Sequence, residues 1–385
     1  MRNSRVCIAA IMKSVSFAPN LIRDKTKRMA QRTCPSAGER ELPVKLVKYI
    51  SNPASAGKDT AGIIGNAKNA LQKIFILLRN RTGHDFSVYK KSTVCRRIER
   101  RMRINNLNRV TEYLRYLQIH PQEPDLLFRE LLIGVTDFFR DPEAFEALLK
   151  KGLPLLLENR PRNSVIRAWV IGCSTGEEAY SLAMLLRVFL SKKKSGVHKF
   201  RIFATDIDKN SLAAARLGVY PSVISADLSE ARLRKYFIIE DDKYRVRREL
   251  REMIHFAAQD IITDPPFTGL DVISCRNVLI YLNSEVQKKL FQLFHGALNP
   301  SGLLFLGNCE SPGSSGSLFK PVDRRHKIFS RREATDSQGE PIGLPPFLPY
   351  RVKKENGTDI RAGLSLSYVS GVTEAEIDSQ KRASA

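Results

Sequence analysis

A mostly apolar, strand-like run leads directly into a turn bounded by glycines and then into a helical pattern. The run is Val165–Ile171, the turn Gly172–Glu178 reads Gly-Cys-Ser-Thr-Gly-Glu-Glu, and apolar residues recur at helical spacing from Ala179 to Leu190. A strand, a glycine turn and a helix N-terminus together surround the polar end of a nucleotide-like ligand. Two carboxylates in the turn would repel a phosphate, so we expect a ligand with hydroxyls, an amino-acid head or a cationic group.

The alternation of strand and helix continues through residues 161–332 and predicts an α/β fold. Strands joined by helices form a mostly parallel, doubly wound sheet, whose ligand lies at the carboxyl ends of the strands. Residues 236–250 interrupt this rhythm with two short strand-like pieces, which predicts an inserted β-hairpin. We expect strands at Val165–Ile171, Phe200–Thr205, Ile254–Ala258, Leu270–Ser274 and Leu303–Leu306, and helices at Glu177–Leu190, Ser211–Leu217 and Ser284–Leu298.

The rest of the chain divides into a leader, a helical domain and a tail. Residues 1–66 are basic and lack a sustained period, so we expect a disordered leader. Residues 67–160 carry helical stripes, beginning at Leu71–Leu78, and predict a small all-helical domain. Within it, Asp141-Pro142-Glu143 is typical of a helix N-terminus, with Asp141 as the cap. Residues 333–385 are polar and rich in Pro and Gly, which predicts a disordered tail.

Charge, cysteine spacing and hydropathy exclude several classes of protein. The net charge is +23, but most of the excess lies in residues 1–110. The later part is close to neutral, so it has no electrostatic support for binding nucleic acid. The six cysteines include no Cys-x-x-Cys pair, and no metal site is expected. No apolar run approaches the roughly 20 residues that span a bilayer, and we find no convincing signal peptide, so we expect no membrane insertion and a cytoplasmic location.

Polar residues follow three successive strands of the predicted sheet. Asp206 closes the strand Phe200–Thr205, where its carboxylate can accept both hydroxyls of a ribose. Asp260 ends the next strand, where an adenine amino group would pass, and Asn277 follows the third, where it can bond an amino or carboxylate group. The alternatives are a helix N-cap, for which Asp208 is a better candidate than Asp206, and simple turn chemistry for Asp260 and Asn277.

The ligand that suits these residues is S-adenosylmethionine. A dinucleotide site would need Gly-x-Gly-x-x-Gly, and an ATP site would need a lysine after Gly176; neither is present. A glycine turn, two acids and an Asn suit a ribose, an adenine, a zwitterionic head and a sulfonium. Asp264-Pro265-Pro266-Phe267 resembles a signature of amino-group methyltransferases that act on DNA. It lies before the fourth predicted strand rather than at its end, so we interpret it as a loop.

Four segments together resemble the chemoreceptor glutamate methyltransferases of the CheR type. They are TDFFRDPEAF, WVIGCSTGEEAYSLAM, ATDID and CRNVLIYL, in the order that the family has. The resemblance implies a helical N-terminal domain, a Rossmann-like methyltransferase domain with a small β insertion, and methyl transfer from S-adenosylmethionine to receptor glutamates. GHDFSVYKKSTVCRRIERRM is similar to the methyltransferase part of hybrids that fuse methylesterase, methyltransferase and sensor segments.

The resemblance also implies roles for individual residues. It makes Arg140 a contact to the cofactor and to the catalytic centre, Glu177 a contact to the amino-acid end of the cofactor, and Asp206 the ribose ligand. The predicted cofactor contacts are Thr136, Arg140, Gly172, Glu177, Asp206, Asp260, Asn277 and Val278. Gly134 stands where some members carry an Asn contact. The hairpin around Glu240–Lys243 lacks the glycine loop of members that dock a receptor's C-terminal pentapeptide, so we expect no such docking.

The chemistry expected of this family needs little from acid–base groups. A glutamate is already ionised at pH 7, because its free pKa is about 4.3, and it needs no general base to attack a methyl sulfonium. The protein would hold oxygen and methyl in line and exclude water. Arg140 is the candidate that aims the carboxylate, since a guanidinium matches it bidentately. An ordinary salt bridge between domains is the alternative for Arg140.

A basic helix face is a candidate dock for an acidic receptor helix. Apolar residues line the opposite side at helical spacing, and the basic face carries Arg96, Arg97, Arg100, Arg101 and Arg103. A solvated face without a partner is the alternative, and nucleic acid is disfavoured because no aromatic residues interleave with the arginines. One further function stays open, namely a non-catalytic S-adenosylmethionine-binding or scaffold module in a hybrid signalling protein.

Overall fold

The computed structural model describes residues 58–158, 164–191 and 199–333. Nearly all of the predicted leader and the predicted tail lie outside these ranges. The first described helix, α4 (Lys58–Thr82), begins inside the segment that we expected to be a disordered leader. No helix among the described residues is long and apolar enough to cross a membrane.

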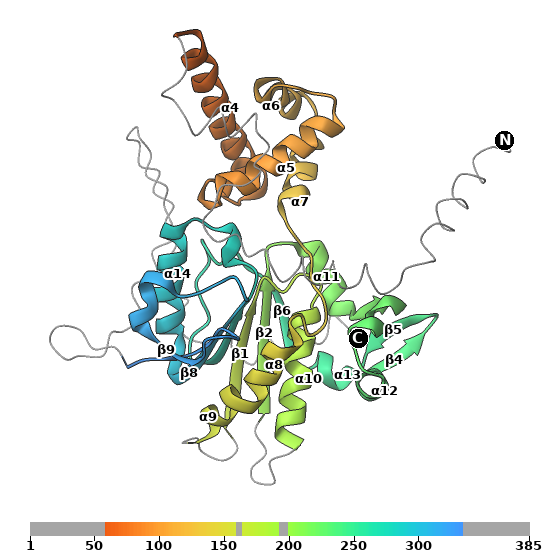
Figure 1. Ribbon diagram of the computed structural model, residues 1–385. Coiled ribbons are helices and arrows are strands. Elements are labelled where there is room, and N and C mark those ends of the chain that lie inside the picture. Colours follow the sequence, from red (N-terminus) through yellow and green to blue (C-terminus); the bar gives the residue numbers. More distant parts are fainter. Residues whose placement is uncertain (1–57, 159–163, 192–198, 334–385) are drawn as a thin grey trace, which may run out of the picture. The chain divides into compact units, whose positions relative to one another are not determined.

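The helical part packs its apolar stripes around one core. α4 is followed by α5 (Lys91–Ile104), α6 (Val110–Ile119) and α7 (Glu123–Leu131) (Figure 1). Ile74 and Leu78 of α4 are fully buried together with Ile98 of α5 and Leu127 of α7. These residues recur at the three- and four-residue spacing that places them on one side of each helix, which is why the stripes predicted from the sequence meet.

The connection to the sheet contains α8 (Pro142–Ala147), a π-helical turn (Leu148–Gly152) and α9 (Leu153–Leu157). Asp141 precedes α8, as predicted, but it is not a conventional cap. Its backbone is left-handed, with φ of 60°, and its side chain makes no capping bond. The carboxylate instead accepts a hydrogen bond from Arg276, 2.9 Å away. The capping interpretation of the Asp141 side chain was therefore wrong.

A seven-stranded sheet forms the centre of the second part. Its order is β6-β2-β1-β7-β8-β10-β9. The first five strands are parallel, and β10 is antiparallel to both of its neighbours. The predicted doubly wound α/β fold is confirmed. The bounds are β1 Val165–Ile171, β2 Lys199–Asp206, β6 Ile254–Ala258, β7 Leu270–Cys275, β8 Leu298–Leu306, β9 Phe319–Asp323 and β10 Ile328–Arg331.

Both faces of the sheet are buried, and β1 contributes to each. Val170 joins the core cluster that includes α10 (Glu177–Ser191). Trp169 faces the other way, against Phe267 and against Phe294 of α14 (Ser284–Ala297), with ring centroids 5.4 and 6.5 Å apart. Two-sided burial explains why the parallel strands read as apolar runs rather than as alternating patterns. The remaining large helices are α11 (Lys209–Leu217) and α14 (Ser284–Ala297).

The β insertion has three strands rather than the predicted two. β4 (Phe237–Glu240) and β5 (Lys243–Val246) form the expected hairpin, and β3 (Val219–Pro221) pairs with the other edge of β5. Asp241 and Asp242 both have positive φ, 44° and 59°, as a two-residue type I′ turn requires. β3 was missed because three residues carry no measurable period. The insertion also holds α12 (Glu230–Tyr236) and α13 (Arg248–Arg251).

Candidate functional site

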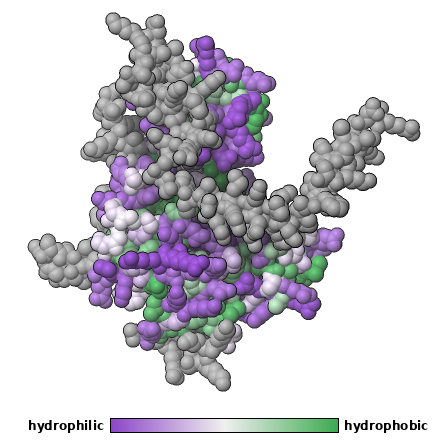
Figure 2. Space-filling model, in the orientation of Figure 1, coloured by the Kyte–Doolittle hydropathy of each residue, from purple (hydrophilic) through white to green (hydrophobic). Residues whose placement is uncertain are grey.

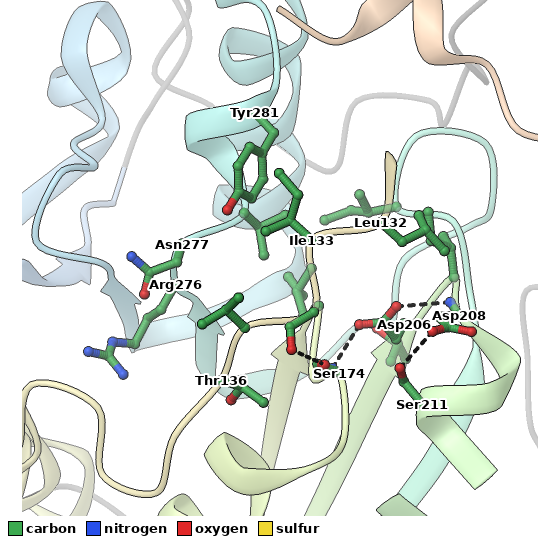
Figure 3. Close-up of a pocket in the computed structure, with 18 of the residues that line it drawn as sticks. Leu132, Ile133, Thr136, Ser174, Asp206, Asp208, Ser211, Arg276, Asn277 and Tyr281 are labelled. Carbon is green, nitrogen blue, oxygen red and sulfur yellow. Dashed lines mark hydrogen bonds between the residues drawn. The ribbon is translucent and has the colours of Figure 1, made fainter. Parts of the chain in front are cut away.

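A pocket lies at the carboxyl ends of the parallel strands, where the doubly wound fold predicts a ligand (Figure 3). The turn after β1, the end of β2 and the loops after β6 and β7 each contribute to its wall. The helical part contributes Tyr89 and Thr93, and the segment Leu131–Thr136 closes another side. Seven predicted cofactor contacts line this pocket: Thr136, Arg140, Gly172, Asp206, Asp260, Asn277 and Val278.

The glycine turn is shaped by close backbone approach. Gly172 has a φ of 67°, and a Cβ built on it would lie 2.5 Å from Cγ2 of Val278. A side chain at Gly172 would therefore displace a second lining residue, Val278. Ser174 also has positive φ, 48°, and its amide donates to Oδ2 of Asp206 at 2.7 Å. The turn after β1 and the end of β2 are thereby held together.

Asp206 and Asp208 have different roles, as the sequence suggested. Asp208 caps α11, with its carboxylate accepting from the amide of Asn210 at 2.9 Å and from the hydroxyl of Ser211 at 2.6 Å. Asp206 accepts instead from the amides of Ser174 and Asp208, at 2.7 and 2.9 Å. Burial raises the pKa of Asp206, and these amides oppose the rise. The capping alternative applies to Asp208, and the ribose contact of Asp206 stays a prediction.

Asp260 connects the pocket wall to the helical part. Its Oδ2 lies 2.9 Å from Nδ1 of His84, and its Oδ1 accepts from the amide of Ile262 at 2.9 Å. Asp264, in the proline loop, accepts from the Asp260 amide at 2.8 Å, while Phe267 stacks on Phe203 with centroids 4.5 Å apart. These contacts are those of a packed loop, in line with our interpretation of Asp264–Phe267. Sequence reasoning missed the contact of His84.

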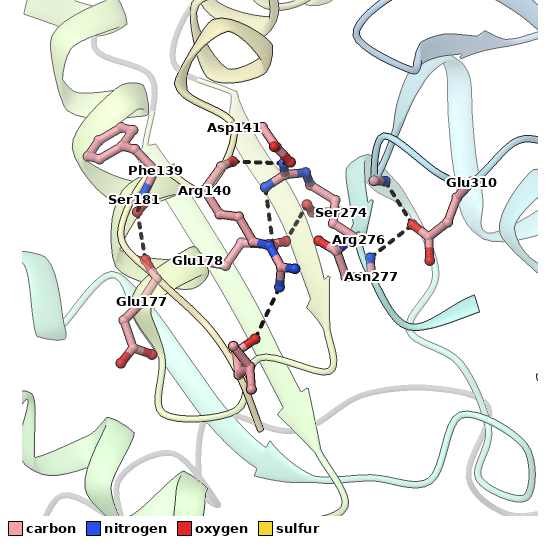
Figure 4. Close-up of polar contacts among 12 residues, drawn as sticks. Phe139, Arg140, Asp141, Glu177, Glu178, Ser181, Ser274, Arg276, Asn277 and Glu310 are labelled. Carbon is pink, nitrogen blue, oxygen red and sulfur yellow. Dashed lines mark hydrogen bonds and ion pairs between the residues drawn. The ribbon is translucent and has the colours of Figure 1, made fainter. Parts of the chain in front are cut away.

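A buried arginine, Arg276, organises the other side of the pocket (Figure 4). Its side chain is 1% exposed, and its Nη2 donates to the carbonyl of Arg140 at 2.8 Å and to the carboxylate of Asp141 at 2.9 Å. Nη1 lies 3.5 Å from Oε2 of Glu178, whose Oε1 accepts from the hydroxyl of Ser274 at 2.7 Å. Burial raises the pKa of Glu178, and Arg276 opposes the rise. Nε and Nη1 of Arg276 have no hydrogen-bond partner among the described residues.

Sequence reasoning assigned no role to Arg276 and treated Glu178 only as one of the two acids of the glycine turn. The available signal was the charge itself, because Arg276 directly follows a fully buried strand, β7, and Glu178 is the second residue of a helix whose first turn is largely buried. Charges in such places are rarely isolated, since an unpaired buried charge is costly. Which charges pair across the fold was not readable from the sequence.

Arg140 lines the pocket with a guanidinium that is only half-buried. Its Nη1 donates to the carbonyl of Val135, 3.1 Å away in the same loop. Among the described residues it forms no ion pair, so the salt-bridge alternative finds no support there. Tyr281 also lines the pocket, and its side chain is drawn near Ile133 (Figure 3). Burial raises the pKa of Tyr281, and the charge of Arg140 opposes the rise.

Glu177 differs from the other predicted contacts because its side chain does not line the pocket. Its carboxylate accepts from the hydroxyl of Thr175, at 2.8 and 2.7 Å to its two oxygens. Figure 4 shows it turned away from Arg276 and Asn277. Burial raises the pKa of Glu177 to about 7, and the nearby carboxylate of Asp137 adds to the rise. Its contact to the amino-acid end of a cofactor stays a prediction.

The five arginines of the predicted dock divide into two groups. Arg101 binds the buried carboxylate of Glu123 through two bonds of 2.9 and 2.6 Å, and Arg97 donates to Glu130 at 3.1 Å. These two arginines join α5 to α7. Arg96, Arg100 and Arg103 are exposed, although Arg100 lies 3.4 Å from Glu130. The face of the helical part seen in Figure 2 is largely hydrophilic.

The pocket has the groups for positioning and few for acid–base or metal chemistry. In the described part of the chain, no group of three or more His, Cys, Asp or Glu residues could hold a metal ion. Cys173, in the glycine turn, is buried, and burial raises its pKa well above the ordinary value, which disfavours the reactive thiolate. The pocket wall carries the carboxylate of Asp206 and the half-buried guanidinium of Arg140, groups that suit a ligand with hydroxyls or a positive charge and a ligand with a carboxylate respectively.

Comparison with known families identifies the class of protein. Residues 134–328 match the S-adenosylmethionine-binding domain of CheR methyltransferases, so the chain is a methyltransferase that uses S-adenosylmethionine. Residues 69–132 match the all-alpha domain of the same proteins. The chain belongs to the CheR methyltransferase family, and the resemblance found in its sequence is confirmed.

Several relatives share this region at moderate identity. An uncharacterized 104.1 kDa protein of Rhodobacter capsulatus is 38% identical over 68% of this chain, but the match spans 27% of that protein's length. The chemotaxis protein methyltransferase of Listeria monocytogenes is 32% identical over 63% of this chain and 87% of its own length. That of Escherichia coli is 33% identical over 67% of this chain and 87% of its own length.

Proposed function

We propose that this chain transfers the methyl group of S-adenosylmethionine to glutamate side chains of chemoreceptors, forming methyl esters. The observation that carries the substrate half of this proposal is Arg140. Its guanidinium lines the cofactor pocket and forms no ion pair with a described carboxylate, although its charge opposes the rise that burial causes in the pKa of Glu178, so it is available to a carboxylate from outside. A planar guanidinium binds a carboxylate bidentately and so fixes the direction of the attacking oxygen.

The reaction needs alignment more than proton transfer. The glutamate oxygen attacks the methyl carbon, the carbon–sulfur bond breaks, and the electron pair stays on sulfur, which becomes a neutral thioether. Because the carboxylate is ionised before it binds, no side chain has to remove a proton. The proposed work of Arg140 is to hold the oxygen in line, while the lining residues keep water away from the sulfonium.

The helical part supports a docking role beside the pocket. α5 begins next to the site, because Thr93 lines the pocket, and it carries Arg96 and Arg103 outward on its exposed surface. We propose that these exposed arginines meet an acidic receptor helix, whereas Arg97 and Arg101 hold the helices together. The receptor regions that the family methylates are cytoplasmic, and we propose the same location for this reaction.

The short β4–β5 hairpin supports the expectation that a receptor's C-terminal pentapeptide does not dock here. Its two-residue turn, Asp241-Asp242, leaves no loop to hold such a peptide. Nucleic acid is not proposed as a partner. The exposed arginines of α5 lie on a helix without interleaved aromatic side chains, which base stacking would need.

The test is methyl transfer to receptor-containing membranes from labelled S-adenosylmethionine, followed by mild base. Wild-type protein is expected to produce base-labile methyl esters. Arg140→Ala is expected to lose most of this activity while still binding S-adenosylhomocysteine, although more weakly because Arg140 is also a predicted cofactor contact. Binding without any transfer by wild-type protein would favour the scaffold alternative. Near-normal transfer by Arg140→Ala would remove the proposed role of Arg140.

Charge reversal tests the dock separately. Arg96→Glu together with Arg103→Glu should raise KM for receptor and leave cofactor binding unchanged. Arg324→Glu, at an exposed position on the turn before β10, is the matched control and should change neither. An unchanged receptor KM in the double variant would contradict the docking surface.

A further inference from the structure

One buried carboxylate outside the pocket, that of Glu310, binds four backbone amides. Its Oε2 accepts from Gly307 at 2.7 Å and from Asn277 at 2.9 Å. Its Oε1 accepts from Leu279 at 2.8 Å and from Ile280 at 3.3 Å. Glu310 is 4% exposed, and no described lysine or arginine forms an ion pair with it. Three of the four amides belong to the segment after β7 rather than to the loop that carries Glu310.

That segment has a backbone which needs external support. Asn277 adopts a left-handed conformation, with φ of 59°, which few residues adopt without compensation. A single 3-10 turn, Leu279–Tyr281, follows, and its N-cap residue Val278 supplies no side-chain cap. The amides of Leu279 and Ile280 are those that a cap would satisfy. Glu310 satisfies them from a neighbouring strand connection.

The other end of the segment is held by the helical part. The amide of Lys90 donates to the carbonyl of Tyr281 at 2.8 Å, and the amide of Asn283 donates to the carbonyl of Val88 at 3.0 Å. Asn277, Val278 and Tyr281 belong to the segment held by these two attachments, and all three line the pocket. The hydrogen bonds of Glu310 therefore help to fix the backbone that carries these three side chains.

We propose that Glu310 is a positioning residue for cofactor binding, acting through Asn277, Val278 and Tyr281. A carboxylate is suited to this task because it offers acceptors only and bonds amides more strongly than a neutral group does. Each carboxylate oxygen accepts from two amides, so a glutamine would turn its NH2 group toward two of the four amides and lose those bonds. The proposal rests on the pocket being the S-adenosylmethionine site.

The test compares Glu310→Gln with a control on the opposite end of β7. Asp271 is also buried, accepts from the amide of Arg167 at 2.8 Å and from Nδ2 of Asn299 at 2.7 Å, and does not line the pocket. Asp271→Asn should lower the thermal midpoint without changing affinity for S-adenosylhomocysteine. Glu310→Gln should weaken that affinity at least about tenfold, the loss expected for one hydrogen bond to a charged group.

Binding is measured by calorimetry well below the thermal midpoint of each variant, so that a folded but less stable protein still binds normally. KM for S-adenosylmethionine should rise in Glu310→Gln, with a smaller change in KM for receptor. Equal affinity of Glu310→Gln and wild type, or equal losses in Glu310→Gln and Asp271→Asn, would overturn the positioning role. If wild-type protein itself does not bind S-adenosylhomocysteine, the assignment of the pocket fails instead.

A second variant reaches the same contact if Glu310→Gln does not fold. A Cβ at Gly307 would lie 2.7 Å from Oε2 of Glu310 and 2.9 Å from the amide nitrogen of Asn277. Gly307→Ala should therefore push the carboxylate and the segment apart and weaken binding of S-adenosylhomocysteine severalfold. Gly316→Ala is the control, because nothing lies within 4 Å of its built Cβ. Wild-type affinity in Gly307→Ala would contradict the proposal.

Discussion

Replacing Arg276 by methionine tests whether the buried charge network stabilises the fold as its geometry implies. Methionine keeps an apolar stem near Phe145 and Phe305, whose ring centroids lie 5.0 and 4.7 Å from the guanidinium carbon. The carboxylates of Glu178 and Asp141 lose their partner. Asp141 is a third exposed and can be solvated, whereas Glu178 is only 14% exposed. The expected loss therefore comes mainly from Glu178.

The magnitude depends on pH, with a sign that follows from the pKa of Glu178. Removing one partner of a buried pair costs about 3–5 kcal/mol, a large part of a typical stability of about 5–15 kcal/mol. Burial already holds the pKa of Glu178 above its ordinary value of 4.5, and loss of Arg276 raises it further. The folded variant then binds a proton that the unfolded chain has released, so its stability falls as pH rises above 4.5.

The assay is urea unfolding followed by circular dichroism at pH 5.5 and pH 8. We expect Arg276→Met to lose about 3 kcal/mol at pH 8 and clearly less at pH 5.5, where Glu178 takes up a proton. Adding Glu178→Gln should recover part of the loss at pH 8, so the two substitutions are not additive. A loss below about 1 kcal/mol at pH 8, or one that is the same at both pH values and additive with Glu178→Gln, would refute this reasoning.

Three further outcomes follow from the contacts described above. Because burial raises the pKa of Glu177 to about 7, the ligand-free protein should lose up to about 3 kcal/mol of stability as the pH rises from 4.5 to 7. In thermal unfolding, Glu177→Gln should flatten this dependence of stability on pH. Asp206→Asn should weaken binding of S-adenosylhomocysteine about 10- to 100-fold, measured by calorimetry. The reason is that an asparagine side chain cannot accept hydrogen bonds from both backbone amides and from a ribose. Unchanged affinity would contradict the ribose contact. Arg101→Ala should destabilise the chain by about 3 kcal/mol, since it removes the only ion-pair partner that a described residue gives the buried Glu123. Arg103→Ala should cost less than about 0.5 kcal/mol, and equal effects in urea unfolding would contradict the division of the arginine face.

The sheet and the place of the site were predictable from the sequence for a physical reason. Parallel strands buried on both faces read as apolar runs, so β1 (Val165–Ile171) and β6 (Ile254–Ala258) were found with their observed bounds. The carboxyl ends of such strands converge, which is why Asp206, Asp260 and Asn277 line one pocket although they are far apart in sequence. The pattern of apolar residues and the order of strands and helices along the chain were sufficient for these conclusions.

The supporting contacts were not predictable, because they depend on which distant side chains meet. Nothing local marks Glu310 as the acceptor for amides near Asn277, and the sequence Asp141-Pro142 suggests a cap where the structure has an ion pair with Arg276. Glu177 and Glu178 are adjacent and alike in sequence, but only Glu178 lines the pocket. One step along a helix rotates a side chain by about 100°, and only the docked helix shows which carboxylate faces the ligand.

The attachment of Val88 and Lys90 to Asn283 and Tyr281 has a consequence for engineering this chain. α5 begins at Lys91, immediately after that attachment, and the lining residues Tyr89 and Thr93 flank its first residue. A chimera that imports the helical domain of a relative therefore exchanges part of the cofactor wall together with the helix proposed to face the receptor. Under the proposed docking role, substrate choice and cofactor affinity would be inherited as one unit, so a swap made to redirect specificity should be judged by both.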